Sequence, residues 1–170
     1  MYVLPSMPRQ FTPSNNEGTW RTLSTHEWNH ILTIRAGASD KVGYATVNGV
    51  HGIIILSDGE FADPAKNTST KAHEKKFVPK ATTEWDSNVY SADDWKAMQS
   101  SGAVFLPAAG DRNGVGVSYV GDSCYYWTSS SGNPAGGAYY VRFKYNEISP
   151  SDRTTRRQFG CSVRLVTDCK

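Results

Sequence analysis

The pattern of apolar and polar residues predicts two short helices in the first hundred residues. Ser24 followed by Glu27 fits a capping box, apolar residues with helical spacing come next, and Gly37 ends the segment. A second helix is expected from Ser91 to Gly102, again with apolar residues at helical spacing behind its first turn.

The rest of the chain predicts short strands and long loops. The longest continuous apolar stretch, residues 53–56, is typical of a buried strand. The predicted strands are 45–47, 52–56, 104–107, 125–127, 138–145 and 162–166. Residues 57–90 show no sustained helical or strand period of apolar residues, which is typical of functional or disordered loops. The segment Gly114-Val115-Gly116 predicts a hairpin turn. Two short helices followed by a glycine-punctuated β region predict an α+β fold.

Length and composition indicate one domain with a core of its own. The chain has 170 residues, of which 38% are hydrophobic. Residues 1–18, rich in Pro, Ser and Asn, are expected to be a linker or an extended arm before a domain of residues 19–170. They contain no apolar run typical of a signal peptide, and no stretch of the chain is long and apolar enough for membrane insertion. Either the protein stays inside the cell, or this chain is a piece of a longer protein.

The charge gives no general reason to expect nucleic acid as a partner. The net charge is only +2, but basic residues gather in the segments 66–80 and 142–164. One interpretation is solvated loop surface, and the other is a patch for an anionic partner.

The segment His26-Glu27-Trp28-Asn29-His30 fits the H-E-x-x-H pattern of zinc proteases. A third ligand is missing, since Thr33 and Ala36 occupy the positions of glycine and histidine in the extended pattern. Glu27 is also expected to cap the helix, which competes with a role as a base. We therefore expect no metal here, and zinc proteolysis remains a minor alternative.

No other motif of catalysis stands out. His51 and His73 lie on separate segments, and no G-x-S-x-G elbow occurs. The spacing of Cys124, Cys161 and Cys169 matches neither a zinc ribbon nor a C-x-x-C pair. One disulfide with a free thiol and three reduced thiols are both compatible with it.

The aromatic residues between positions 125 and 159 are more informative. Eight of them lie there: Tyr125, Tyr126, Trp127, Tyr139, Tyr140, Phe143, Tyr145 and Phe159. On strands about half would point outward, where tyrosines beside arginines and small polar residues make a binding surface. The alternative is that they are core aromatics with ordinary loop residues.

Five blocks carry a resemblance to a known family. They are TWRTLSTHEWNHIL (19–32), ATVNGVHGIIILSD (45–58), WKAMQSSGAVFLPAAGDRNG (95–114), YYWTSSS (125–131) and GCSVRLV (160–166). In this order they resemble the major paralogous domain of Fibrobacter and Bacteroides surface proteins. The resemblance implies a C-type lectin-like fold, in the version shared with the formylglycine-generating enzyme.

Many members of that group are variable proteins of diversity-generating retroelements, in which an altered C-terminal segment is displayed for ligand binding. The resemblance implies a diversified surface at residues 120–160 on a scaffold that includes Trp127. The displayed, ligand-binding residues would be Tyr125, Tyr140, Arg142, Lys144, Tyr145, Ser149, Arg153, Thr154, Gln158 and Phe159. Cys124 and Cys161 would be varied positions rather than a disulfide.

The sequence departs from the catalytic and calcium-binding relatives of this fold. The calcium motifs of lectins are absent, and Cys161 and Cys169 do not match the closely spaced cysteine pair of the sulfatase-activating enzyme. We therefore expect a non-enzymatic receptor-recognition domain with no cofactor, metal or catalytic residue. Its partner would be a protein or glycan on a cell surface, and its location the surface of a bacterium or of a phage virion. An enzyme related to the formylglycine-generating group and a structural domain of a fibre or pilus are the alternatives.

Overall fold

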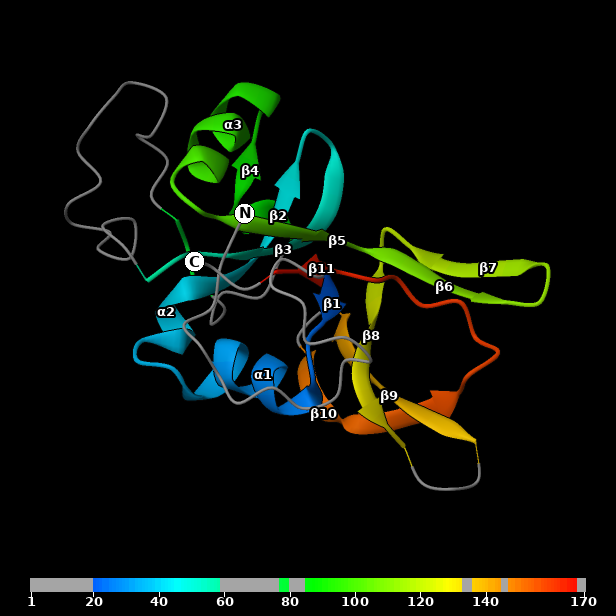
Figure 1. Ribbon diagram of the computed structural model, residues 1–170. Helices are drawn as coiled ribbons and strands as arrows, with labels where there is room; N and C mark the ends of the chain where they lie inside the picture. Colours follow the sequence, from blue (N-terminus) through cyan, green and yellow to red (C-terminus); the bar gives the residue numbers. More distant parts are fainter. Residues whose placement is uncertain (1–19, 59–76, 80–84, 133–135, 145–146, 168–170) are drawn as a thin grey trace.

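Three β-sheets dominate the computed structural model, which describes residues 20–58, 77–79, 85–132, 136–144 and 147–167. The strand orders are β1-β11, β10-β9-β8-β6-β7 and β4-β2-β3-β5 (Figure 1). The strands are β1 (Arg21–Thr22), β2 (Val42–Val47), β3 (Val50–Ile55), β4 (Val89–Tyr90), β5 (Val104–Pro107), β6 (Ala109–Asn113), β7 (Gly116–Val120), β8 (Ser123–Ser131), β9 (Gly137–Lys144), β10 (Glu147–Arg156) and β11 (Leu165–Val166). The helical elements are α1 (Thr25–Asn29), the π-helix η1 (His30–Ile34), α2 (Ala38–Lys41), the 3₁₀-helix η5 (Trp85–Ser87) and α3 (Ala92–Ser100).

The α+β class predicted from the sequence is wrong, and with it the C-type lectin-like fold that the resemblance implies. The described part of the chain is β-rich, with three sheets and only short helices. The error came from segments whose apolar pattern is weak. Residues 109–120 and 147–156 are too polar or too rich in glycine to read as strands, yet they form β6, β7 and β10. Their strand pairing is set by neighbouring strands rather than by local sequence.

Both predicted helix starts are confirmed. The Ser24 hydroxyl accepts from the Glu27 N–H, and the Glu27 carboxylate accepts from the Ser24 N–H. Ser91 and Asp94 form the same reciprocal pair at the start of α3. Each pair satisfies two backbone N–H groups that have no partner within the helix. The predicted turn at Gly114 is confirmed as well, because β6 and β7 pair on either side of it.

The four-stranded sheet lies between two apolar cores. One core holds side chains such as Tyr44 and Ile53 from one face of the sheet, and packs them against Trp28 of α1. The second core holds Ile54 from the other face and packs it against Met98 of α3. In Figure 1, α1 and α3 accordingly lie on opposite sides of this sheet. A strand covered on both faces needs a continuous apolar run, which is what residues 53–56 supply.

The five-stranded sheet has only one face in the core. Burial alternates along β8: Cys124 and Tyr126 are buried, whereas Tyr125 and Trp127 are half-exposed. Phe143 of β9 lies opposite Cys124 and joins the same core. The other face is therefore left without a layer of described residues. At the far edge, the β6–β7 hairpin projects from the body (Figure 1).

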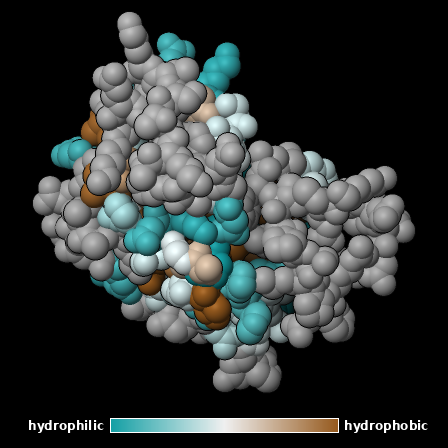
Figure 2. Space-filling model, turned by 90° about the vertical axis from the view of Figure 1, so that its left-hand side faces the viewer, coloured by the Kyte–Doolittle hydropathy of each residue, from teal (hydrophilic) through white to brown (hydrophobic). Residues whose placement is uncertain are grey.

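Two predictions fall on segments that the structure does not describe. The expected arm, residues 1–18, and most of the expected loop at 57–90 lie outside the described residues. Within the part described, no helix is both long and apolar enough to cross a membrane. The side of the molecule away from the hairpin, seen in Figure 2, mixes hydrophilic and hydrophobic residues among those that are coloured.

Candidate ligand-binding face

A row of aromatic side chains crosses the outer face of the five-stranded sheet. Tyr125 of β8 contacts Tyr140 of β9 with 5.7 Å between ring centroids, and Trp127 contacts the same Tyr140 at 6.5 Å. Tyr119 of β7 extends the row, 6.2 Å from Tyr125. We call Tyr119, Tyr125, Trp127 and Tyr140 the aromatic row. Its rings are tilted or edge-on to one another, as aromatic pairs prefer.

Tyr119 reaches the row because of an unusual backbone at the β6–β7 edge. Its φ is +61°, a left-handed conformation that is costly for a bulky residue by about 1–3 kcal/mol. Gly110 of β6 lies beside it with φ +68°, and a Cβ there would stand 2.0 Å from the Ser118 carbonyl oxygen. With no side chain at Gly110, the Tyr119 ring can meet the Tyr125 ring across β6. Strain of this kind at a tyrosine that is 57% exposed does not serve the core, which points to a functional position.

Charged residues lie next to the row on β9 and β10. Arg142 pairs with Tyr125 in the register and forms an ion pair with Glu147, which Lys144 also contacts at 3.3 Å. The Arg142 Nε is buried and has no hydrogen-bond partner within the described part of the chain. Part of the donor capacity of this guanidinium is therefore unused. Burial raises the pKa of the Tyr125 hydroxyl, so Tyr125 stays a neutral donor and acceptor.

The structure brings together some of the predicted displayed residues. Tyr125, Tyr140, Arg142 and Lys144 lie at alternate positions that share the outer face. In the register of β9 and β10, Arg153 is paired with Tyr140, a residue of the outer face. Thr154 is paired with Tyr139, the next residue along β9 in the opposite direction, at a register position of the other face.

Three of the other predicted residues are described: Ser149, Gln158 and Phe159. Ser149 belongs to β10 but is buried, with 7% of its surface exposed, so its side chain is not part of the displayed surface. Gln158 and Phe159 lie in the turn after β10, just before Gly160 pairs with Arg112 of β6. Tyr145 lies outside the described residues.

Sequence reasoning missed two members of the aromatic row. Trp127 was assigned to the scaffold by the resemblance, although a strict alternation from Ser123 to Trp127 would have placed it beside Tyr125. Tyr119 lies before the segment predicted to be displayed, and no local pattern signals its left-handed backbone. Only the three-dimensional pairing of Gly110 with Cys124 shows that β7 lies close enough to contribute.

The H-E-x-x-H segment has a structural explanation. Both oxygens of the Glu27 carboxylate accept hydrogen bonds from the Arg21 guanidinium, at 3.0 and 2.7 Å, and one also accepts from Ser24. Burial opposes ionisation, but these bonds outweigh it and hold the pKa of Glu27 below its ordinary value. His26 is exposed one residue before this carboxylate. The glutamate is thus committed to the helix start, as the capping box predicts.

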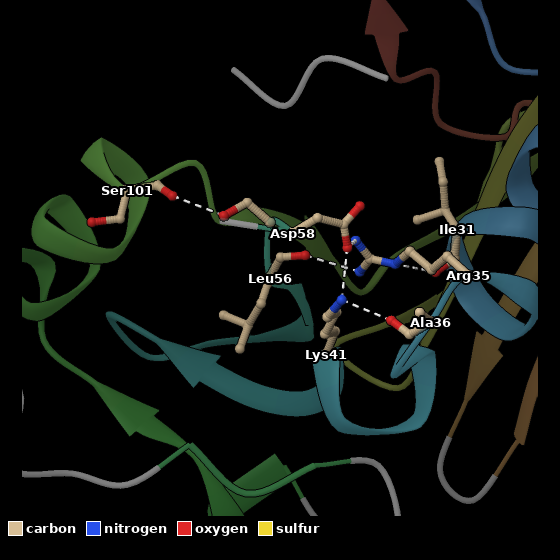
Figure 3. Close-up of polar contacts among 8 residues, drawn as sticks. Ile31, Arg35, Ala36, Lys41, Leu56, Asp58 and Ser101 are labelled. Atoms are coloured by element: carbon tan, nitrogen blue, oxygen red, sulfur yellow. Dashed lines mark hydrogen bonds and ion pairs between the residues drawn. The ribbon is translucent and has the colours of Figure 1, made fainter. Parts of the chain in front are cut away.

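A second charge cluster, in which Arg35 is buried and Asp58 is exposed, joins the helical layer to the central sheet (Figure 3). Arg35 is buried and donates to the carbonyls of Ile31 and Leu56 and to the Asp58 carboxylate. Lys41 contacts the same carboxylate at 2.8 Å. Each described polar group here is used to close a helix end or a strand end, so the cluster is structural.

Neither described cysteine forms a disulfide. Cys124 is fully buried and Cys161 partly buried, and both are free thiols. Burial, with a smaller contribution from Asp111, raises the pKa of Cys161 to about 12, so its reactive thiolate is scarce at neutral pH. Across the described residues, no group of three or more His, Cys, Asp or Glu side chains is placed to hold a metal ion.

Comparison with known proteins adds no family to this picture. No family model, no curated protein and no solved structure matches the chain.

Proposed function

We propose that the chain is a non-enzymatic ligand-binding domain that uses the outer face of its five-stranded sheet. The observation that carries the proposal is the aromatic row, four half-exposed or exposed rings in contact across three strands beside Arg142. The opposite face of β8 and β9 supplies the core, through side chains such as Tyr126 and Phe143. This division puts the rings on the face that no described layer covers, while the packed opposite face fixes the backbone of β8 and β9 beneath them.

The chemistry of the face suits recognition. Tyrosine and tryptophan supply large contact area with few rotatable bonds, and they and arginine dominate the energetics of protein interfaces. Each ring of the row is held by a neighbouring ring, so less side-chain entropy is lost on binding. Arg142 adds charge-assisted hydrogen bonding beside Tyr125 in the row.

The resemblance to retroelement variable proteins supplies a more specific form of the proposal. The segment that would be diversified provides Tyr125, Tyr140, Arg142 and Lys144 at outward positions, where a change of side chain leaves the core untouched. The ligand would be a protein or glycan on a cell surface, met by this domain as part of a bacterial surface protein or a phage virion. The neighbouring DNA tests this form. We expect a near-copy of the coding segment for residues 120–166 that differs chiefly at adenines, close to a reverse transcriptase gene.

Binding itself is tested with two probes, a glycan array and a displayed library of random linear peptides. The variant Tyr125→Ala/Tyr140→Ala/Arg142→Ala should bind the selected ligand at least tenfold more weakly than the unmodified chain. The matched control is Ile34→Ala/Lys96→Ala, which removes one exposed apolar and one exposed basic side chain from the helical elements. It should bind like the unmodified chain. A triple variant that stays folded and keeps full affinity would show that the ligand binds elsewhere.

A further inference from the structure

Among the described residues, the edge of the five-stranded sheet at β7 lacks the protection that edge strands usually have. β7 is the last strand in the sheet order, and all five of its residues are exposed. Residues 114–120, Gly-Val-Gly-Val-Ser-Tyr-Val, contain no charged residue and no proline. Charges, proline and covering loops are the means by which proteins prevent pairing at an edge. Val117 of β7 is 61% exposed, so this open edge can pair with another strand.

The register of the hairpin shows which backbone groups face this edge. β6 and β7 are antiparallel, with Asn113 opposite Gly116 around a two-residue turn, followed by Arg112 opposite Val117. Opposed pairs alternate between bonded and non-bonded in an antiparallel ladder, and the pair that closes a two-residue turn is bonded. Val117 is therefore at a non-bonded position, so its N–H and C=O point away from β6 toward the open edge.

Tyr119 connects this edge to the aromatic row. It lies two residues after Val117 on β7, and its left-handed backbone places its ring against Tyr125. A strand paired to β7 would therefore have side chains beside Val117 and Tyr119, at the end of the proposed ligand-binding face.

We propose that β7 accepts an extended, acidic polypeptide segment of the ligand as an additional strand of the sheet. This inference rests on the proposed function and names the ligand of that face as a protein. The added strand binds through main-chain hydrogen bonds at Val117, and its side chains on the outer face contact Tyr119 and the aromatic row. The acidic character follows from charge complementarity. Residues 109–167 contain seven basic and four acidic residues, so their excess of positive charge is larger than the net charge of +2 of the whole chain.

Two other occupants fit the edge less well. A glycan offers no repeating N–H and C=O groups to match a strand edge, and the side chains of β7 supply one hydroxyl each at Ser118 and Tyr119 for its hydroxyl groups. A second copy of this chain would bring its own basic excess. Pairing of two five-residue strands, each about 17 Å long, would also bury far less than the roughly 1,200 Å² of a stable interface. An acidic segment is opposite in charge to this basic region. If it continues onto the aromatic row, it also buries additional surface area there.

The variant Val117→Pro tests the inference, because proline removes the N–H that faces the edge and leaves the bonded positions of the hairpin intact. Val117→Ala is the matched control, since it removes the same side chain but keeps the N–H. Peptides selected from the random linear library against the unmodified chain are synthesised, and their affinities are measured by fluorescence anisotropy. We expect selected peptides rich in Asp and Glu, a loss of at least tenfold with Val117→Pro, and a change below threefold with Val117→Ala.

A second measurement does not depend on the proline variant folding. Hydrogen exchange on the unmodified chain should show that the Val117 amide becomes protected when the peptide binds. Three outcomes would overturn the inference. These are equal peptide affinities of the two Val117 variants without protection at Val117, selection of a glycan but no peptide, and concentration-dependent dimerisation abolished by Val117→Pro. If binding still depends on Tyr125, Tyr140 and Arg142 in any of these cases, the proposed function stands while the strand addition fails.

Discussion

The two large sheets use the same kind of backbone for opposite purposes. The four-stranded sheet is apolar on both faces, and Ile53 and Ile54, although they point to opposite sides, are both fully buried. The five-stranded sheet buries one face only, so Tyr126 is in the core while its neighbour Tyr125 is half-exposed. One sheet is the structural centre of the molecule, and the other is a platform with a free side.

The difference shows where the molecule can change without unfolding. A side chain between the two cores of the four-stranded sheet touches packed neighbours whichever way it points. On the five-stranded sheet, alternate positions can change with little effect on the core, which is the property a display surface needs. The following predictions test this division, beginning with the largest effect.

Ile54→Ala should give the largest loss of stability. The side chain is fully buried in the core between β3 and α3, so its removal loses transfer free energy and leaves a cavity. We expect a loss of about 4 kcal/mol in the free energy of unfolding. Tyr140→Ala on the outer face removes more atoms and should cost only about 1 kcal/mol, chiefly its aromatic contacts. Urea denaturation of both variants measures the difference, and equal losses would contradict the division.

Gly110→Ala should destabilise the β6–β7 edge by about 3 kcal/mol. The new methyl group would meet the Ser118 carbonyl oxygen at 2.0 Å, and the residue would keep an unfavourable left-handed backbone. Gly114→Ala is the matched control, because its φ is also positive, at +60°, but no atom lies within 4 Å of the added group. It should lose only about 1 kcal/mol. Thermal unfolding compares the two, and similar losses would show that the close approach at Gly110 is not important.

Glu27→Gln should lower stability by about 2 kcal/mol at neutral pH and flatten its dependence on pH. The carboxylate caps α1, which lies under the inner face of the five-stranded sheet, and is paired with Arg21. Since folding lowers the pKa of Glu27 from its ordinary value of 4.5, its contribution is present above that value and is lost as the pH falls through the lower folded pKa. Urea denaturation from pH 7 to pH 3 should therefore show a smaller fall for the variant. An equal fall in both proteins would mean that the ionisation of Glu27 does not contribute to the pH dependence of stability.

The sequence predicted the parts of the fold that local chemistry decides. The capping boxes at Ser24 and Ser91 and the buried run at residues 53–56 could be read directly, because each is specified by neighbours in the chain. The class was wrong because β7 and β10 become strands only through pairing with distant segments. The same limit applies to the candidate site. Tyr125 and Tyr140 were predicted to share a face, whereas Tyr119 joins them through a backbone conformation that only the Gly110 contact explains.

Lys144→Ala should have the smallest effect on stability, below about 0.5 kcal/mol. The Lys144 side chain is 46% exposed, and its ion pair with Glu147 is of the surface kind that contributes little. Its loss leaves Glu147 paired with Arg142, so no charge is left buried alone. Glu147→Ala is the informative companion, since it removes the partner of the largely buried Arg142 and should cost more. Denaturation measurements that found Lys144→Ala as costly as Glu147→Ala would mean that even an exposed position of this face is fixed by folding, and a surface fixed in that way could not be diversified.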